Sequence, residues 1–253
     1  MQNKKEWILQ RLQEGGVASA AFEAAQLATL EEDAVAAAVE QRISGYPLQY
    51  ILGEWEFFGL PFFVGEGVLI PRPDTEILVE QALALLRDKP GARVLELCAG
   101  SGCVSVAIAK NTDAEVTAVE LSSQAFVYLE KNIARNEAAV KAVKADVLQG
   151  MEGRFDLIVS NPPYIRTEVL QTLSAEVQKE PTMALDGGAD GLRFYRAIAE
   201  IYKKNLAADG KLLFEIGYDQ RESVSAVLQR AGYKNVRCFK DYGGNDRVIS
   251  ANL

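Results

Sequence analysis

From Lys89 onward, short apolar runs alternate with longer stretches in which apolar residues recur at helical spacing. The short runs predict strands at 93–97, 115–120, 140–145, 156–160 and 211–216. The longer stretches predict helices at 102–110, 122–136, 191–204 and 218–231. Two more strands, 234–238 and 247–251, close the chain around a Gly-Gly-Asn-Asp turn. Strands separated by helices predict an α/β fold with a doubly wound, mostly parallel sheet and an antiparallel C-terminal strand.

Residues 3–44 carry helical spacing alone, in three runs. The expected buried positions of these runs are Trp7, Ile8 and Leu12, then Phe22, Ala25 and Leu30, then Val35, Ala38, Val39 and Ile43. Because so small a helical unit has little core of its own, we expect it to pack on another surface or to recruit a partner. The alternative that stays open is that these helices only stabilise the rest of the protein as a cap.

The stretch 45–64 changes to aromatic and β-branched runs broken by glycines. We interpret it, from Tyr50 onward, as a β-hairpin that links two domains. In the next segment, Asp74 or Thr75 is expected to cap a helix at 76–86. Arg72 lies between two prolines that stiffen its backbone, so we expect it to line a cleft.

Composition limits the chemistry that the chain can perform. The formal net charge is −8, so there is no overall basic footprint for nucleic acid. The chain has no histidine, which excludes Ser-His-Asp and Cys-His catalysis, and we expect no metal site. Its three cysteines lack the spacing of a disulfide set, which favours a cytoplasmic protein. We expect no signal peptide and no contact with a membrane, because no apolar run approaches spanning length.

The stretch Ser160–Tyr164 reads Ser-Asn-Pro-Pro-Tyr and follows a buried strand directly. Two prolines end that strand at once, since neither donates to a sheet ladder. The result is a rigid corner at the carboxyl end of a parallel strand, where open α/β sheets bind their ligands. We therefore take Asn161, Pro162, Pro163 and Tyr164 as the candidate catalytic residues.

Three other strand ends carry candidate ligand-binding residues. The first predicted strand runs into the turn Glu96-Leu97-Cys98-Ala99-Gly100-Ser101-Gly102, whose glycines allow a ligand to approach the backbone. Ser105 stands where a dinucleotide fingerprint has its third glycine, which disfavours a nicotinamide dehydrogenase. Glu120 ends the second strand, where a carboxylate can accept both ribose hydroxyls of a nucleoside. Asp146 and Val147 end the third, beside the expected base pocket.

These strand ends resemble those of class I, Rossmann-like methyltransferases that use S-adenosylmethionine. The resemblance narrows to the glutamine-N5 methyltransferases of bacterial peptide-chain release factors (HemK/PrmC type), in order over about residues 42–250. It rests on Arg42-x-x-Gly45-x-Pro47-x-x-Tyr50-Ile51-x-Gly53, Ile70-Pro-Arg-Pro-Asp-Thr-Glu76, the Asn-Pro-Pro-Tyr corner, Glu180-Pro181, Ala184-Leu-Asp-Gly-Gly188, Glu215-Ile-Gly217 and Asp241-x-x-Gly244-x-Asp246-Arg247. Departures from the usual pattern are Glu96, Cys98, Glu120 and Val147.

The resemblance implies a helical substrate-docking domain with a hairpin linker at 1–66 and a methyltransferase domain at 67–253. It implies that class-1 release factors are the protein substrates, methylated on the glutamine of a Gly-Gly-Gln loop. The cofactor-binding residues it implies are Arg72, Glu96, Cys98, Ala99, Gly100, Ser101, Gly102, Glu120, Asp146, Val147 and Asn161.

The chemistry of the Asn-Pro-Pro-Tyr corner suits an amide substrate. An amide nitrogen is a poor nucleophile, and two acceptors, the Asn161 side-chain oxygen and the Pro162 carbonyl, are expected to hold its two N–H groups. Tyr164 is expected to stack on the planar amide. Three alternatives stay open: a glutamine methyltransferase acting on a ribosomal protein, an adenine-N6 or guanine-N2 nucleic-acid methyltransferase, and a non-catalytic nucleotide-binding module. The acidic charge argues against a direct nucleic-acid substrate.

Overall fold

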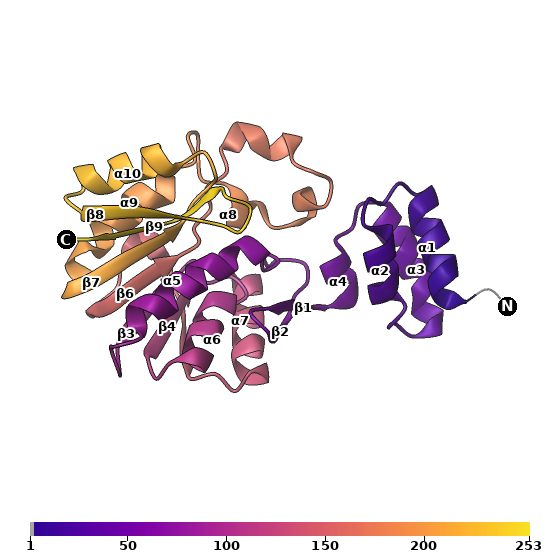
Figure 1. The fold of residues 1–253 in the computed structure, drawn as a ribbon, viewed down its shortest axis with the longest axis horizontal. Coiled ribbons are helices and arrows are strands. Elements are labelled where there is room, and N and C mark those ends of the chain that lie inside the picture. Colours follow the sequence, from indigo (N-terminus) through magenta and orange to yellow (C-terminus); the bar gives the residue numbers. More distant parts are fainter. Residues whose placement is uncertain (1–2) are drawn as a thin grey trace.

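The computed structural model describes residues 3–253, in which a small helical unit lies beside a larger α/β domain (Figure 1). The helical unit consists of α1 (Lys4–Glu14), α2 (Ala20–Leu27) and α3 (Glu32–Ile43). Its core includes Ile8, Leu12, Leu27 and Val39, all with no exposed surface. The predicted domains are 1–66 and 67–253. Residues 1 and 2 of the first lie outside the described part of the chain, and the division after residue 66 stays a prediction.

The second helix turns a different face inward from the one predicted. Phe22 is 53% exposed, whereas Ala20, Ala24 and Leu27 are buried. The cause is Glu23, which is buried on the same face because its carboxylate pairs with the Arg42 guanidinium. The expected stripe through Phe22 was therefore wrong, because an ion pair with a distant helix sets the rotation of α2.

The predicted hairpin is shorter than expected. Residues Leu48–Leu52 form a helical turn, α4, and only β1 (Glu54–Phe57) and β2 (Leu60–Phe63) pair as antiparallel strands. Pro47 precedes this helix and Gly53 ends it with a φ of 75°, which is the usual proline and glycine placement at helix ends. The hairpin contacts both units, since Trp55 packs on the helical core and Phe57 on the sheet domain.

The helix after the hairpin begins differently from the prediction. A 3₁₀ turn, Pro73–Thr75, leads directly into α5 (Glu76–Leu86), and Thr75 has a helical backbone with no capping hydrogen bond. Neither expected residue caps the helix, because both side chains are engaged elsewhere. The Asp74 carboxylate pairs with Arg247 at 3.1 Å, and the Thr75 hydroxyl accepts from Asn161 at 3.3 Å.

The larger domain is a seven-stranded sheet in the order β5-β4-β3-β6-β7-β9-β8, in which β9 is antiparallel to both of its neighbours. Its strands are β3 (Arg93–Leu97), β4 (Glu115–Glu120), β5 (Val140–Lys144), β6 (Phe155–Ser160), β7 (Leu206–Glu215), β8 (Lys234–Lys240) and β9 (Asp246–Asn252). The central strands are almost continuously buried, as parallel strands covered on both faces must be. Strand β7 begins five residues before its predicted start, and its pairing with β6 shifts register there.

Helices cover both faces of the sheet (Figure 1). The helices α5, α6 (Cys103–Asn111) and α7 (Ser123–Arg135) pack on one face, and α9 (Arg193–Ile201) and α10 (Arg221–Arg230) on the other. Between β6 and α9 lie short turns that were not predicted, at Thr167–Thr172, Val177–Lys179 and α8 (Thr182–Leu185). None of the helices within residues 3–253 is long and apolar enough to cross a membrane. The doubly wound fold class is confirmed.

The chain reverses its direction of winding at β3. From β3 it proceeds through β4 to β5 at one edge, then returns to place β6 on the other side of β3. The carboxyl ends of β3 and β6 lie side by side, with Leu97 opposite Ser160, and the Ser160 hydroxyl donates to the Leu97 carbonyl at 2.7 Å. Such a switch point leaves a crevice between the loops, and it is the usual ligand site of this architecture.

Candidate active site

A cavity of ≈ 270 Å³ opens at this switch point. Most of the predicted site residues line it: Arg72, Glu96, Cys98, Ala99, Gly100, Ser101, Glu120, Asp146, Val147, Asn161 and Pro163. Three predicted residues do not, namely Gly102, Pro162 and Tyr164. The fold therefore brings together residues from four strand ends that are far apart in the sequence.

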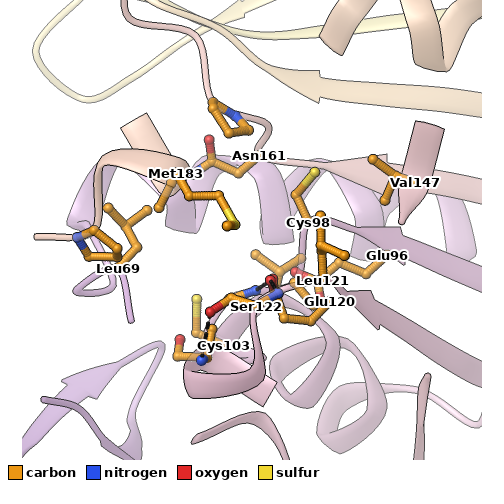
Figure 2. A pocket seen from close by; sticks show the side chains of 18 of the residues that line it. Leu69, Glu96, Cys98, Cys103, Glu120, Leu121, Ser122, Val147, Asn161 and Met183 are labelled. Carbon is orange, nitrogen blue, oxygen red and sulfur yellow. Dashed lines mark hydrogen bonds between the residues drawn. The ribbon is translucent and has the colours of Figure 1, made fainter. Parts of the chain in front are cut away.

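Glu120 is fixed on the cavity wall by two backbone donors. Its Oε2 accepts from the Gly100 amide at 2.8 Å and its Oε1 from the Ser122 amide at 2.7 Å (Figure 2). The residue is 8% exposed, so the carboxylate is largely shielded from water. Each oxygen keeps a second lone pair for a ligand, because a carboxylate oxygen accepts two hydrogen bonds. A ligand with two adjacent hydroxyl groups fits this carboxylate.

The turn after β3 lines the cavity with Cys98, Ala99, Gly100 and Ser101. Gly100 has a φ of +56°, and a Cβ atom added there would meet no protein atom within 4 Å. Because Gly100 itself lines the cavity, the missing side chain leaves room for a ligand beside the backbone. Cys98 also adopts a left-handed φ of 60°, and burial raises the pKa of its thiol, which is therefore not a reactive thiolate.

Glu96 lies at the inner end of the same turn. Its Oε2 accepts from the Ser105 amide at 3.0 Å, which ties the strand end to the first turn of α6. Burial raises the pKa of Glu96 to about 8. Gly102 begins α6 with a φ of +78°, and an added Cβ would lie 2.4 Å from Leu129 Cδ1, so its role is to let this helix approach α7.

The remaining walls are mostly apolar. Val147 lies beside Asp146, whose Oδ1 accepts from the Leu148 amide at 2.8 Å and so fixes the loop after β5. Figure 2 shows Leu69, Leu121 and Met183 pointing into the same space. Sequence reasoning missed these residues, together with Cys103, Ala184, Arg193 and Phe194. Apart from Ala184, which begins the Ala-Leu-Asp-Gly-Gly motif, these residues have no local signal in the sequence, because they reach the cavity from segments whose positions depend on the whole fold.

Arg72 does line the cleft, as predicted, and its guanidinium forms an ion pair with the buried Glu180 carboxylate. The same carboxylate accepts from the Ile70 amide at 3.0 Å through Oε2. Glu180 thus connects the segment before α8 to the segment before α5. Both segments form the rim of the cavity next to Asn161.

Asn161 lies across the cavity from Glu120 (Figure 2). Its Nδ2 donates to the Thr75 hydroxyl at 3.3 Å, and within residues 3–253 its side-chain oxygen has no hydrogen-bond partner. Tyr164 does not line the cavity, and its hydroxyl donates to Glu215 Oε1 at 3.5 Å. This contact gives no support to the expected stacking of Tyr164 on a substrate amide. Burial raises the pKa of the Tyr164 hydroxyl, so that group stays a neutral donor.

Known proteins share this fold. The Methyltransferase small domain family model matches residues 73–188. A methyltransferase of known structure from Pyrococcus furiosus superposes with a TM-score of 0.58 at 22% identity, over 78% of this chain and 91% of that one. The family model and this superposition give the chain the fold of the Rossmann-like methyltransferases.

Sequence similarity specifies the family. Release factor glutamine methyltransferase of Clostridium botulinum is 43% identical over 220 residues, which are 84% of this chain and 78% of that protein. The Agrobacterium fabrum protein of the same name is 42% identical over 231 residues, 88% of this chain and 80% of that one. The Fusobacterium nucleatum protein of this name is 44% identical over 81% of this chain, but the chain spans only 59% of its length. The chain belongs to the release factor glutamine methyltransferase family, which confirms the resemblance found in the sequence.

Proposed function

We propose that this enzyme binds S-adenosylmethionine and methylates the side-chain amide nitrogen, N5, of the glutamine in the Gly-Gly-Gln loop of class-1 peptide-chain release factors. The cofactor supplies a methyl group on a positively charged sulfur. The observation that carries the proposal is the placement of Asn161: its oxygen is free to accept an N–H at one side of a cavity whose other side presents Glu120. An acceptor amide and a nucleoside-bearing donor fit this pair of groups.

The cavity walls suit that cofactor. The Glu120 carboxylate has lone pairs for a ribose diol, and Gly100 leaves space beside the backbone. The apolar side chains near Val147 suit a flat base, and the buried Glu96 stands near the inner end of the cavity. Catalysis then consists of positioning and exclusion of water, because charge is neutralised when an amide nitrogen attacks a sulfonium. No strong base is needed, in keeping with a chain without histidine.

We propose that the helical unit docks the release factor. Arg42 of α3 donates both to Glu23 of α2 and to Glu176, which lies in the segment leading to the cavity rim. This contact fixes the helical unit relative to the rim that Pro181 and Met183 form. Exposed Phe22 offers an apolar contact on that unit. Such a protein acts in the cytoplasm, an assignment that its three free cysteines favour.

The test offers labelled S-adenosylmethionine with release factor, ribosomal proteins, tRNA and DNA in parallel. We expect label in the release factor alone, on the loop glutamine when the product is sequenced by mass spectrometry. A release factor with that glutamine replaced by alanine is the matched control and stays unlabelled. Label in a ribosomal protein or a nucleic acid, with none in release factor, overturns the proposed substrate. No binding of S-adenosylmethionine by calorimetry overturns the proposed cofactor.

A further inference from the structure

A series of polar side chains runs from Asn161 to Thr75, which is buried in the cavity wall, and on to the buried Glu215. Asn161 Nδ2 donates to Thr75 Oγ1, and the Thr75 hydroxyl lies close enough to the Glu215 carboxyl to act on it. Thr75 is 2% exposed and Glu215 1% exposed, so water does not replace these contacts. These three side chains come from the loop after β6, from the 3₁₀ turn before α5 and from the end of β7.

The number of protons on these side chains determines which group donates and which accepts in the Asn161–Thr75–Glu215 series. Within the described residues, Glu215 Oε2 is buried with no hydrogen-bond partner, and an unsatisfied buried carboxylate oxygen is costly. The Thr75 hydroxyl has one proton, which is therefore directed at Glu215. Its oxygen can then only accept from Asn161, so Asn161 must present its NH₂ to Thr75 and its carbonyl oxygen to the cavity.

We propose that Thr75 and Glu215 are positioning residues that hold the Asn161 amide in the one orientation able to accept an N–H from the substrate. This inference rests on the proposed function, in which Asn161 receives an N–H of the acceptor glutamine. With the opposite orientation, the NH₂ of Asn161 faces the NH₂ of the substrate, and two donors repel each other.

The charges around Glu215 make the arrangement sensitive to pH. The groups that act on its carboxyl are Arg247 of β9, Asp74 and Thr75 of the 3₁₀ turn, and Tyr164 of the loop after β6. Burial dominates over the nearby guanidinium and raises the pKa of Glu215 to about 7. A protonated Glu215 becomes a donor toward Thr75, which frees the Thr75 proton to point at Asn161 and removes the preference for the productive orientation. Turnover therefore falls as the pH drops through about 7.

The experiment compares Thr75→Val, which keeps the shape but lacks the hydroxyl, with Thr75→Ser, which keeps the hydroxyl. In single-turnover methylation of release factor, we expect Thr75→Val to be slower on the order of tenfold to a hundredfold and Thr75→Ser to stay within about threefold of the parent. Calorimetry should give both variants the parent's affinity for S-adenosylmethionine within about threefold. A Thr75→Val enzyme as fast as Thr75→Ser overturns the inference.

A second variant keeps the inference testable if Thr75→Val fails to fold. Glu215→Gln has the same shape but no ionisable proton, so the fall in rate through pH 7 should disappear, whereas a purely structural role leaves the pH profile of the folded enzyme unchanged.

The side-chain amide resonances of Asn161 supply a readout that needs no acceptor: they should shift between pH 6 and pH 8 in the parent and not in Glu215→Gln. Identical behaviour of the two overturns the inference. A parent that shows the shift but methylates no release factor refutes only the proposed function.

Discussion

Replacing Glu120 with alanine tests the cofactor side of the cavity. The carboxylate is held by the Gly100 and Ser122 amides at 2.8 and 2.7 Å, so its unused lone pairs already point in fixed directions. A hydrogen bond to a charged group contributes about 1.5–3 kcal/mol. Because water enters the space left by the side chain and recovers part of this, we expect the affinity for S-adenosylmethionine to fall roughly ten- to a hundredfold.

The assay is isothermal calorimetry on folded protein, with unfolding followed in parallel. Glu115→Ala is the matched control, since Glu115 lies at the other end of the same strand with a side chain 76% exposed, and its removal should leave affinity unchanged. If Glu120→Ala binds S-adenosylmethionine as tightly as Glu115→Ala does, Glu120 does not hold the ribose and the cofactor has been placed wrongly.

Three further predictions concern docking, packing and pH. A chain that begins at Gly45 should still bind S-adenosylmethionine but methylate release factor at least about tenfold more slowly; full activity would make the first three helices a simple cap. Gly102→Ala should lower the free energy of unfolding by about 1–3 kcal/mol in denaturant titration, because its φ is +78° and the added Cβ lies 2.4 Å from Leu129; an unchanged midpoint contradicts this. Burial raises the pKa of Glu96 from 4.5 to about 8, so the folded state binds this proton more tightly than the unfolded state. The resulting stability is fully present below about pH 4.5 and is lost as the pH rises through 8, on the order of 3 kcal/mol between pH 6 and 9. Glu96→Gln should lack this decline, and equal slopes for parent and variant would refute the assignment.

The sheet could be predicted because the residues that define each strand lie within that strand or directly after it. Parallel strands buried on both faces read as continuous apolar runs, and each strand end is marked by the turn residues directly after it. Pro162 and Pro163 stop β6, and the glycines after β3 stop that strand. Because the topology places these ends at one edge of the sheet, the sequence alone assigns Asn161 and Glu120 to one site.

The features that the sequence did not reveal depend on contacts between distant segments. The Glu23–Arg42 pair rotates α2 so that Phe22 faces outward, and no periodicity in α2 alone carries that pairing. Thr75 looks like a capping residue by its position, yet its hydroxyl is taken by Asn161 of another loop. Residues Tyr50–Leu52 were predicted as a strand but are helical, and here the signal was local. Pro47 and Gly53 mark the ends of a short helix, but the aromatic and β-branched composition favoured a strand in the prediction.

The most direct test of the account is the rate of methyl transfer by Asn161→Ala. If Asn161 aims the acceptor amide, removing its oxygen should raise the barrier by about 3–4 kcal/mol, a fall in single-turnover rate of two to three orders of magnitude. Cofactor affinity and the melting temperature should change little, because Asn161 contributes one 3.3 Å hydrogen bond to Thr75 and lies at the cavity surface. A folded Asn161→Ala enzyme that methylates release factor within a factor of about three of the parent would contradict the role given to Asn161 and, with it, the active site described.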